Sequence, residues 1–558
     1  LTIMQTNTWN GSGIVDDYIA LGSARKSDSG SESDLNRLNL RGQTEIAFRN
    51  SVGFNSTNCG DKEIRQGQGG YGCRWSEDGG YNYLAISGSN GQDQIVISAG
   101  EMLSAGQLST TKIWGSVELG GFTDSLVLEP NTHLDLVGDL SMGSGESQAI
   151  TISEDADFSV RSIHGDVDLT IDGISSLGGD QVLSLYTPDP GSELGQRNTL
   201  SSYTGTTTVN DNGILRAAQP WSLSYRSPHH VDGNLIIGDG NLREDQQIAE
   251  LTGKGSVYLG NQSHLFYGFY GGSNLDFEYS GSSSGNGSLV KQGPGTVLIS
   301  GALGHTGFTK VHEGTMLLAA DEVLSRTSTV LVSSPTKNPA LDLGGTTQDV
   351  TQTNLHGGIL KNGFLTPGNS IAVERRTNLI NSVKADPTQD ENNIDVVVTY
   401  SAAPNDPEVK LTFAGSNEFQ NLSIDRASVE IAPVSSLALV DGIQGSDFSP
   451  RDSDLSLQDR VDVRGQLTVV LGVEDESGTL NYGNGLIDLG AGNDLFKIGF
   501  SGSVSLDGAG TDSRSLLIQG GAGAFDVFWN ENADLDLDAS NIDGFEIVAY
   551  RGEGLAYI

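Results

Sequence analysis

One segment, residues 289–320, constrains the possible fold more than any other part of the chain. It reads LVKQGPGTVLISGALGHTGFTKVHEGTMLLAA, in which short runs of strand-forming residues alternate with glycines. Val297 and Ile299 are two residues apart, as are Thr309 and Val311, and this period of two is typical of strands with one buried face. The glycines mark corners, because glycine tolerates turn conformations that other residues resist. Short strands joined by glycine corners predict a stack of coils rather than a globular domain.

Many positions of this segment follow one pattern of leucine, lysine, glycine, serine, threonine and valine. The matching positions are Leu289, Lys291, Gly293, Gly295, Thr296, Ser300, Gly301, Thr306, Gly307, Thr309, Val311, Gly314, Thr315 and Leu317. The pattern resembles the autotransporter-associated β-strand repeat. The sequence departs from that family at His305, where the family usually has tyrosine, and at Leu298, where it usually has a small polar residue.

Two further stretches carry the same resemblance. Residues 203–218, YTGTTTVNDNGILRAA, repeat the second half of the pattern and keep the tyrosine. Residues 365–371, LTPGNSI, are similar to a corner of autotransporter passengers, and Pro367 and Gly368 suit the centre of a type II turn. The resemblance covers roughly residues 190–380. It implies a passenger-type β-helix protein that is exported from a Gram-negative-type bacterium and is extracellular or associated with the outer membrane at the cell surface.

The composition agrees with an elongated β-structure. The chain has 75 glycines and 36% hydrophobic residues, which gives many corners and a thin core. We therefore predict an all-β fold, a right-handed parallel β-helix (β-solenoid) rod with a distinct N-terminal β-rich domain or cap. Coils of about 20–25 residues are expected for stacked repeats. The expected parts are residues 1–95 as a cap and interaction domain, 96–480 as a β-helix with autotransporter-type repeats, and 481–558 as glycine- and aspartate-rich solenoid coils.

The N-terminal segment differs from the rest of the chain in amino-acid composition. It is rich in aromatic residues and holds the two cysteines of the chain, Cys59 and Cys73. We expect these cysteines to form a disulfide, because the sequence resembles that of a secreted protein and disulfides form in secreted proteins. A metal site is the less favoured interpretation, because no second pair of ligands lies near these cysteines in the sequence. We expect the segment to cover the first open strand edge of the solenoid, and its aromatic side chains could alternatively bind a glycan or a partner protein.

The charge of the chain is unevenly distributed. The net charge is −40, but residues 1–75 contain eight basic and eight acidic residues and are formally neutral. Nucleic acid and anionic membrane surfaces repel a body this acidic, so we expect no nucleic-acid partner. The acidic surface either keeps an extracellular rod soluble or receives the neutral head of a neighbouring copy in a head-to-tail homo-oligomer. Surface or host glycans and proteins are the other expected partners.

The C-terminal segment contains the one metal-like motif of the sequence. The stretches LGAGNDLF and LDGAGTDSRSL share the pattern glycine-x-glycine-x-aspartate, and their aspartates are separated by the length of one coil of a calcium β-roll. This spacing makes Asp494, Asp507 and Asp512 a candidate calcium site, and calcium is the one cofactor expected. The residues between the two stretches lack the motif, so ordinary solenoid corners are the alternative.

The sequence gives little support for an enzyme. The segment SDSGS, residues 27–31, resembles the nucleophile segment of chymotrypsin-like proteases, but that fold requires a histidine upstream of its serine, and the first histidine here is His133. The pair His229 and His230, near Trp221, either binds a sugar or metal or lies in a solvated loop.

We therefore expect a non-enzymatic extracellular or cell-surface protein with a structural or adhesive role, which could self-assemble into a filament or surface layer. No catalytic or cofactor-binding residues are expected, and no run of 18 apolar residues predicts a membrane-spanning helix. The alternative is a carbohydrate-active β-helix enzyme, such as a polysaccharide lyase, glycosidase or depolymerase, which would use a pair of carboxylates.

Overall fold

The computed structural model describes the chain in ranges that are separated by gaps. The described residues are 2–4, 19–20, 35–41, 44–46, 84–87, 92–99, 108–113, 116–119, 123–143, 148–177, 201–238, 243–268, 276–334, 337–367, 371–373, 377–382, 395–399, 410–425, 428–432, 435–445, 460–463, 466–470, 486–489, 494–499, 503–507, 517–520, 526–531, 542–550 and 553–557. The chain divides into two compact units, Leu1–Leu289 and Val290–Ile558.

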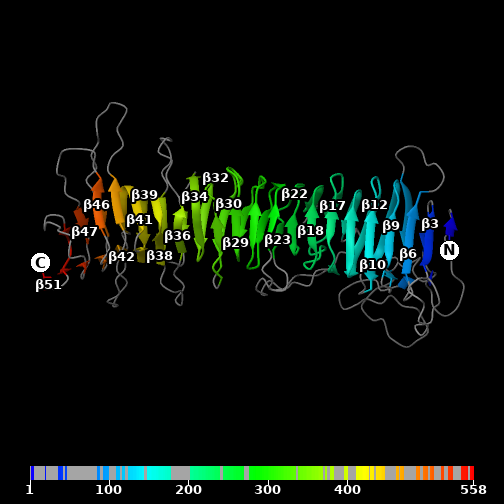
Figure 1. The fold of residues 1–558 in the computed structure, drawn as a ribbon, viewed down its shortest axis with the longest axis horizontal. Helices are drawn as coiled ribbons and strands as arrows, with labels where there is room; N and C mark the ends of the chain where they lie inside the picture. The colour runs from blue at the N-terminus through cyan, green and yellow to red at the C-terminus, as the bar shows by residue number, and fades with distance from the viewer. Residues whose placement is uncertain are drawn as a thin grey trace, which may run out of the picture. The chain divides into compact units, whose positions relative to one another are not determined.

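In each unit the described strands stack in parallel, so that a strand pairs with its equivalents in neighbouring coils (Figure 1). Regular structure in the described ranges consists of β-strands, and none of these residues belongs to a helix that could cross a membrane. This arrangement is a β-solenoid and confirms the predicted all-β parallel fold. The distinct N-terminal cap is not confirmed, because β1 (Thr2–Met4) pairs in parallel with β3 (Leu35–Arg41), and β3 pairs with β6 (Gln92–Ser98), in the same sheet as later coils.

The first unit contains two parallel sheets, here called sheet 1 and sheet 2. Sheet 1 runs in the order β1, β3, β6, β9 (Ser125–Leu128), β11 (Gln148–Ile152), β13 (Val167–Ile171), β16 (Thr207–Val209), β18 (Pro228–Val231) and β21 (Glu250–Thr252). Sheet 2 runs in the order β2 (Ile19–Ala20), β5 (Leu84–Ser87), β8 (Ser116–Leu119), β10 (Thr132–Met142), β12 (Asp157–Gly165), β14 (Ile174–Leu177), β17 (Ile214–Ala217), β19 (Asn234–Ile237), β22 (Ser256–Leu259) and β25 (Ser282–Gly285), with β4 (Thr44–Ile46), β7 (Ser109–Ile113) and β15 (Ser202–Tyr203) joined to it. The unit also contains β20 (Gln246–Gln247), β23 (His264–Tyr267) and β24 (Phe277–Tyr279), and the chain leaves it through β26 (Ser288–Lys291).

The second unit repeats this plan with sheet 3 and sheet 4. Sheet 3 runs in the order β28 (Phe308–Val311), β30 (Thr329–Ser333), β33 (Gln352–His356), β35 (Ile371–Val373), β37 (Asp395–Thr399), β39 (Ser416–Asp425), β41 (Ser436–Gly445), β44 (Leu486–Asp488), β47 (Leu517–Gln519) and β49 (Ile542–Asp543), with β43 (Gln466–Val470) paired to β41 and β46 (Ser503–Asp507) paired to β43. Sheet 4 runs in the order β27 (Thr296–Ile299), β29 (Thr315–Leu318), β31 (Ala340–Asp342), β34 (Ile359–Pro367), β36 (Thr377–Ser382), β38 (Lys410–Ala414), β40 (Ser428–Ile431), β42 (Arg460–Val463), β45 (Leu495–Ile498), β48 (Val527–Asn530), β50 (Ile547–Tyr550) and β51 (Glu553–Tyr557), with β32 (Thr347–Val350) joined to β34. The last pair, β50 and β51, is antiparallel.

The length of a coil can be measured from residues that are hydrogen-bonded across neighbouring coils. His230 and Thr252, which pair through their side chains, are 22 residues apart, and the amide of Gln262 and the side chain of Asn286 are 24 residues apart. These values fall within the predicted 20–25 residues per coil. Another coil is longer, because His164 and Ser202 occupy equivalent positions although they are 38 residues apart.

The core consists of columns of apolar side chains that stack from coil to coil. In sheet 1, Ile152, Ile171, Val209 and Val231 occupy equivalent positions on successive strands, and each is fully buried. Full burial of such a side chain contributes about 1.5–3 kcal/mol, so each added coil lengthens the core by several stabilising contacts. The predicted period of two is also confirmed in β27 and β28, where buried and partly exposed residues alternate.

The two repeat stretches share a buried hydrogen bond that explains the departure at His305. In the first unit, the hydroxyl of Tyr203 lies 2.8 Å from the hydroxyl oxygen of Thr207. In the second unit, Nε2 of His305 lies 3.1 Å from the hydroxyl oxygen of Thr309, which also follows four residues later. Histidine therefore replaces tyrosine as the buried polar ring that holds this corner.

The lysine of the repeat is buried although it carries a charged group. Lys291 is completely buried, and its Nζ donates hydrogen bonds to the carbonyl oxygens of Gln292 at 2.9 Å, Gly293 at 2.7 Å and Glu313 at 3.1 Å. Three acceptors match the three protons of an ammonium group, which offsets the cost of removing it from water. Because Glu313 lies 22 residues later, one of these bonds connects neighbouring coils.

We predict that the substitution Lys291→Met destabilises the second unit by about 2–4 kcal/mol, because methionine fills a similar volume but leaves three inward-facing carbonyl oxygens without this donor. The measurement is chemical unfolding followed by circular dichroism. Lys337→Met is the matched control, since Lys337 is half exposed and forms a surface ion pair with the side chain of Glu313 at 2.9 Å. A surface pair of this kind is worth about 1 kcal/mol or less. Equal losses in the two variants would contradict the role assigned to Lys291.

We also predict that His305→Tyr makes the second unit less sensitive to acid. Burial lowers the pKa of His305 to about 4, against 6.5 for an ordinary histidine. The unfolded chain therefore binds a proton before the folded chain does, so stability is lost as the pH falls from about 6.5 towards 4. Tyrosine stays neutral over this range and can keep the hydrogen bond to Thr309, as Tyr203 does in the first unit.

The test compares the change in unfolding free energy between pH 7.5 and pH 5 for the wild-type chain and the variant. The variant should lose less stability over this interval, whatever its stability at pH 7.5. A wild-type response in His305→Tyr would show that His305 does not contribute to acid sensitivity.

Candidate functional site

One polar cluster among the described residues lies beside an irregularity in the strand pairing of sheet 2. The register of β10 with β12 shifts between Leu136 and Asp139, which is a β-bulge. Before the bulge β10 pairs with β7, and after it β10 pairs with β8. In the same way, β12 pairs first with β14 and then with β15. This change of partners therefore brings side chains from β8, β10, β12 and β15 together at one corner of the coil.

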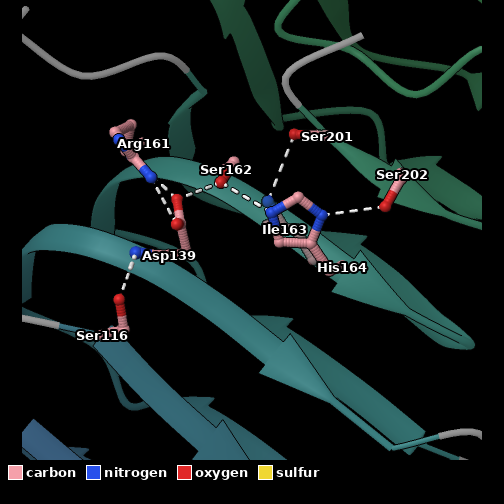
Figure 2. A network of polar contacts seen from close by, with 8 residues as sticks. All are labelled: Ser116, Asp139, Arg161, Ser162, Ile163, His164, Ser201 and Ser202. Carbon is pink, nitrogen blue, oxygen red and sulfur yellow. Dashed lines mark hydrogen bonds and ion pairs between the residues drawn. The ribbon is translucent and has the colours of Figure 1, made fainter. Parts of the chain in front are cut away.

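An ion pair fixes one end of this cluster. Nε of Arg161 donates to Oδ1 of Asp139 at 2.8 Å, and Nη2 of Arg161 donates to the second carboxylate oxygen, Oδ2 (Figure 2). The backbone amide of Asp139 donates to the hydroxyl oxygen of Ser116 at 3.3 Å. A bidentate arginine and a bonded backbone leave the carboxylate little freedom to rotate.

A chain of hydrogen bonds leads from this carboxylate to Ser202. The hydroxyl of Ser162 donates to Oδ1 of Asp139, and its oxygen lies 3.0 Å from Nε2 of His164. On the other side of the imidazole ring, Nδ1 of His164 lies 2.8 Å from Oγ of Ser202 (Figure 2). His164 and Ser202 face each other because they are register partners in β12 and β15.

The direction of each proton in this chain follows from the number of donors. An ionised carboxylate only accepts hydrogen bonds, and a hydroxyl has one proton to donate. Ser162 uses its proton on Asp139, so its oxygen must accept the proton of His164 at Nε2. A neutral imidazole has one N–H, which leaves Nδ1 of His164 as an acceptor and requires Ser202 to donate to it.

The imidazole of His164 is neutral near pH 7. Burial is the main cause that lowers the pKa of His164, and the positive charge of Arg161 lowers it further. The negative charge of Asp139 acts in the opposite direction but does not cancel these effects. The cluster therefore contains a hydroxyl that points its proton at the lone pair of a neutral imidazole, which is the arrangement of a nucleophile and its base.

A second group of charged residues lies on the outward face of sheet 2. Nζ of Lys112 lies 2.7 Å from Asp135, and Nδ1 of His133 lies 3.0 Å from Asp157. The hydrogen bond with Asp157 is the main cause that raises the pKa of His133, and burial acts against it. These pairs connect the neighbouring strands β7, β10 and β12 across the exposed face.

The structure places Asp494, the first residue of the predicted calcium site, in a column of carboxylates in which Asp494 and Asp526 are buried and Glu546 is partly exposed. The backbone amide of Asp494 donates to Oδ1 of Asp526 at 2.9 Å, and the amide of Asp526 donates to Oε2 of Glu546 at 2.7 Å. The first unit has the same device, in which the amide of Asp93 donates to Oδ1 of Asp124 at 2.8 Å. Each carboxylate thus satisfies a backbone amide of the preceding coil.

The remaining predicted site residues are only partly covered. Asp507 lies in β46, but its side chain lies outside the described residues, as do Asp512, Cys59, Cys73 and Gly368. In the part of the chain that the structure describes, no three histidine, cysteine, aspartate or glutamate side chains gather in a way that could hold a metal ion. The calcium site and the disulfide stay predictions.

His229 and His230 lie in β18 and have different surroundings. His230 is half exposed and lies 3.3 Å from Asp232. His229 is fully buried, its Nδ1 donates to the carbonyl oxygen of Ser227 at 2.8 Å, and burial lowers its pKa to about 4. The two histidines do not lie in a solvated loop, because they belong to a strand. They do not share a binding site, because the side chains of neighbouring residues on a strand point to opposite faces.

Sequence reasoning did not identify the cluster around His164. The alternation Ser162-Ile163-His164 is a local signal, since residues two apart on a strand share a face. Asp139 and Ser202 carry no such signal, because only the coil lengths bring them to this corner.

Comparison of the chain with protein-family models, curated protein sequences and solved structures gives no match.

Proposed function

We propose that this chain is a structural or adhesive scaffold of the passenger β-helix type, located outside the cell or at the cell surface. The observation that carries the proposal is the shared geometry of the repeats. Tyr203 and His305 make the same buried bond to a threonine four residues later, and Lys291 bonds carbonyl groups of two coils. The positions that resemble the autotransporter-associated repeat are thus positions that fix corners and, at Lys291, join neighbouring coils, which favours a repeat selected for building a scaffold.

A scaffold of this kind works by holding side chains in a fixed array. Neighbouring strands of a sheet are about 4.8 Å apart, so outward-facing residues of successive coils form rows with regular spacing. Among the described residues, two aromatic side chains are exposed on such faces, Tyr258 in the first unit and Trp529 in the second. Nζ of Lys497 lies 5.7 Å from the centre of the Trp529 ring and 3.1 Å from Glu531. An aromatic ring with polar neighbours suits contact with a sugar or a partner protein.

The alternative function, a carbohydrate-active enzyme, has one candidate pair of carboxylates. Asp135 and Asp157 lie on the adjacent strands β10 and β12 on an exposed face of sheet 2. Each already pairs with a basic side chain, Asp135 with Lys112 and Asp157 with His133. This pairing favours a structural charge ladder over a general acid and base, so we place this function second.

The experiment that tests the scaffold proposal is light scattering with electron microscopy on the purified chain, first with calcium and then with chelator, followed by a glycan array. Polymers would support a filament or layer subunit, and polymers that need calcium would in addition support the site at Asp494, Asp507 and Asp512. Monomers that bind glycans would support an adhesive role, and Trp529→Ala should weaken that binding if the exposed ring takes part.

Monomers that bind no glycan or surface protein would contradict the scaffold proposal. Release of new reducing or unsaturated sugar ends from a polysaccharide, lost in Asp135→Asn or Asp157→Asn, would favour the enzyme instead. Asp342→Asn is the matched control, because Asp342 also pairs with a lysine, Lys361, on an outward face, but in the second unit.

A further inference from the structure

We propose that Ser202 is a nucleophile activated by His164, and that it takes an acyl group from carboxylic esters. This inference goes beyond the scaffold function and does not depend on it. It gives the corner of sheet 2 a chemical activity that neither the fold nor the repeat requires.

The geometry of the corner separates Ser202 from the structural serines beside it. The hydroxyl oxygen of Ser116 accepts the backbone amide of Asp139, and that of Ser201 accepts the backbone amide of Ile163 at 3.2 Å. These two serines satisfy buried backbone groups, as a solenoid corner requires. Oγ of Ser202 instead lies 2.8 Å from an imidazole nitrogen, within the 2.6–3.2 Å range of a working nucleophile and base.

The rest of the cluster holds the base in the form that it needs. Ser162 accepts the proton at Nε2 of His164, which keeps the lone pair at Nδ1 directed at Ser202. Asp139 orients Ser162, and Arg161 orients Asp139. The hydrogen bonds of this chain therefore all run in one direction, from Ser202 towards the carboxylate of Asp139. A positive charge that forms on the imidazole would be stabilised by this carboxylate, with the hydroxyl of Ser162 between them.

The site is also open to a reactant. Ser202 and His164 are partly exposed, whereas Ser162 in β12 and Ser201, which directly precedes β15, are buried. The side chains of Arg161 and Asp139 retain 22% and 15% of their exposure. This partial exposure of both residues is the access that the proposal requires for a small ester.

The chemical step is an acyl transfer in which atoms and protons balance. Oγ of Ser202 attacks the carbonyl carbon of the ester, and the serine proton moves to Nδ1 of His164. The bond between the carbonyl carbon and the alcohol oxygen then breaks, and the leaving alkoxide takes the proton from His164. Water, activated by the same nitrogen, hydrolyses the acyl-serine and releases the carboxylic acid.

The test uses the full chain and a fluorophosphonate, which forms a phosphonyl-serine with loss of fluoride, followed by mass spectrometry of peptides. We expect the label at Ser202, with none in Ser202→Ala. His164→Gln should slow labelling at least about 100-fold, the usual contribution of a general base. Asp139→Asn should slow it less, because it acts through Ser162. Release of nitrophenolate from 4-nitrophenyl acetate should fall in the same order.

The matched control is Ser176→Ala, which removes another partly exposed serine from sheet 2, in β14, and should leave labelling unchanged. Circular dichroism and thermal unfolding establish that each variant is folded. The proposal is overturned if the folded wild-type chain takes no label at Ser202, or if Ser202 is labelled at the same rate in folded His164→Gln.

Discussion

The structure depends on parallel backbone pairing between equivalent residues of successive coils. In this pairing each residue has its own equivalent in the neighbouring coil, so side chains at equivalent positions form columns. Columns such as Ile152, Ile171, Val209 and Val231 use this to build a core that is thin but continuous within the unit. The glycine-rich composition follows, because a coil has many corners and little interior.

Corners create the main difficulty of such a fold, since a backbone amide that turns away from the sheet loses its partner while it stays buried. The chain solves this with side chains of the next coil. Asp124 and Asp526 accept corner amides, and Gln246 and Gln348 do the same for Leu223 and Leu324 at 3.0 Å and 3.1 Å. Lys291 supplies the opposite device, a buried donor for corner carbonyls. Acidic residues at corners are thus part of the architecture as well as of the charge of the chain.

The sequence predicted those features that depend on local spacing. The alternation at Val297, Ile299, Thr309 and Val311 predicted strands with one buried face, and the glycines between these strands predicted the corners. The resemblance to a known repeat also pointed to His305 as a departure, although only the structure showed that histidine and tyrosine make the same bond there.

The cluster at Asp139, Ser162, His164 and Ser202 could not be predicted in the same way. The coil that ends at Ser202 has 38 residues, whereas the two later coils measured above have 22 and 24, so a fixed repeat length would have placed the wrong residue beside His164. A bulge between Leu136 and Asp139 shifts the register once more. Irregular coil length and one extra residue are decided by tertiary packing, and they determine which side chains meet.

The antiparallel pair of β50 and β51 has a consequence for growth of the stack. Ile547 pairs with Tyr557 and Tyr550 pairs with Glu553, so the chain runs backwards across this edge of sheet 4. A further coil that arrived in the orientation of β48 would meet a strand of opposite polarity, and residues would no longer face their own equivalents. The direction of β51 therefore ends the parallel stacking at this edge, whatever side chains an arriving coil carries.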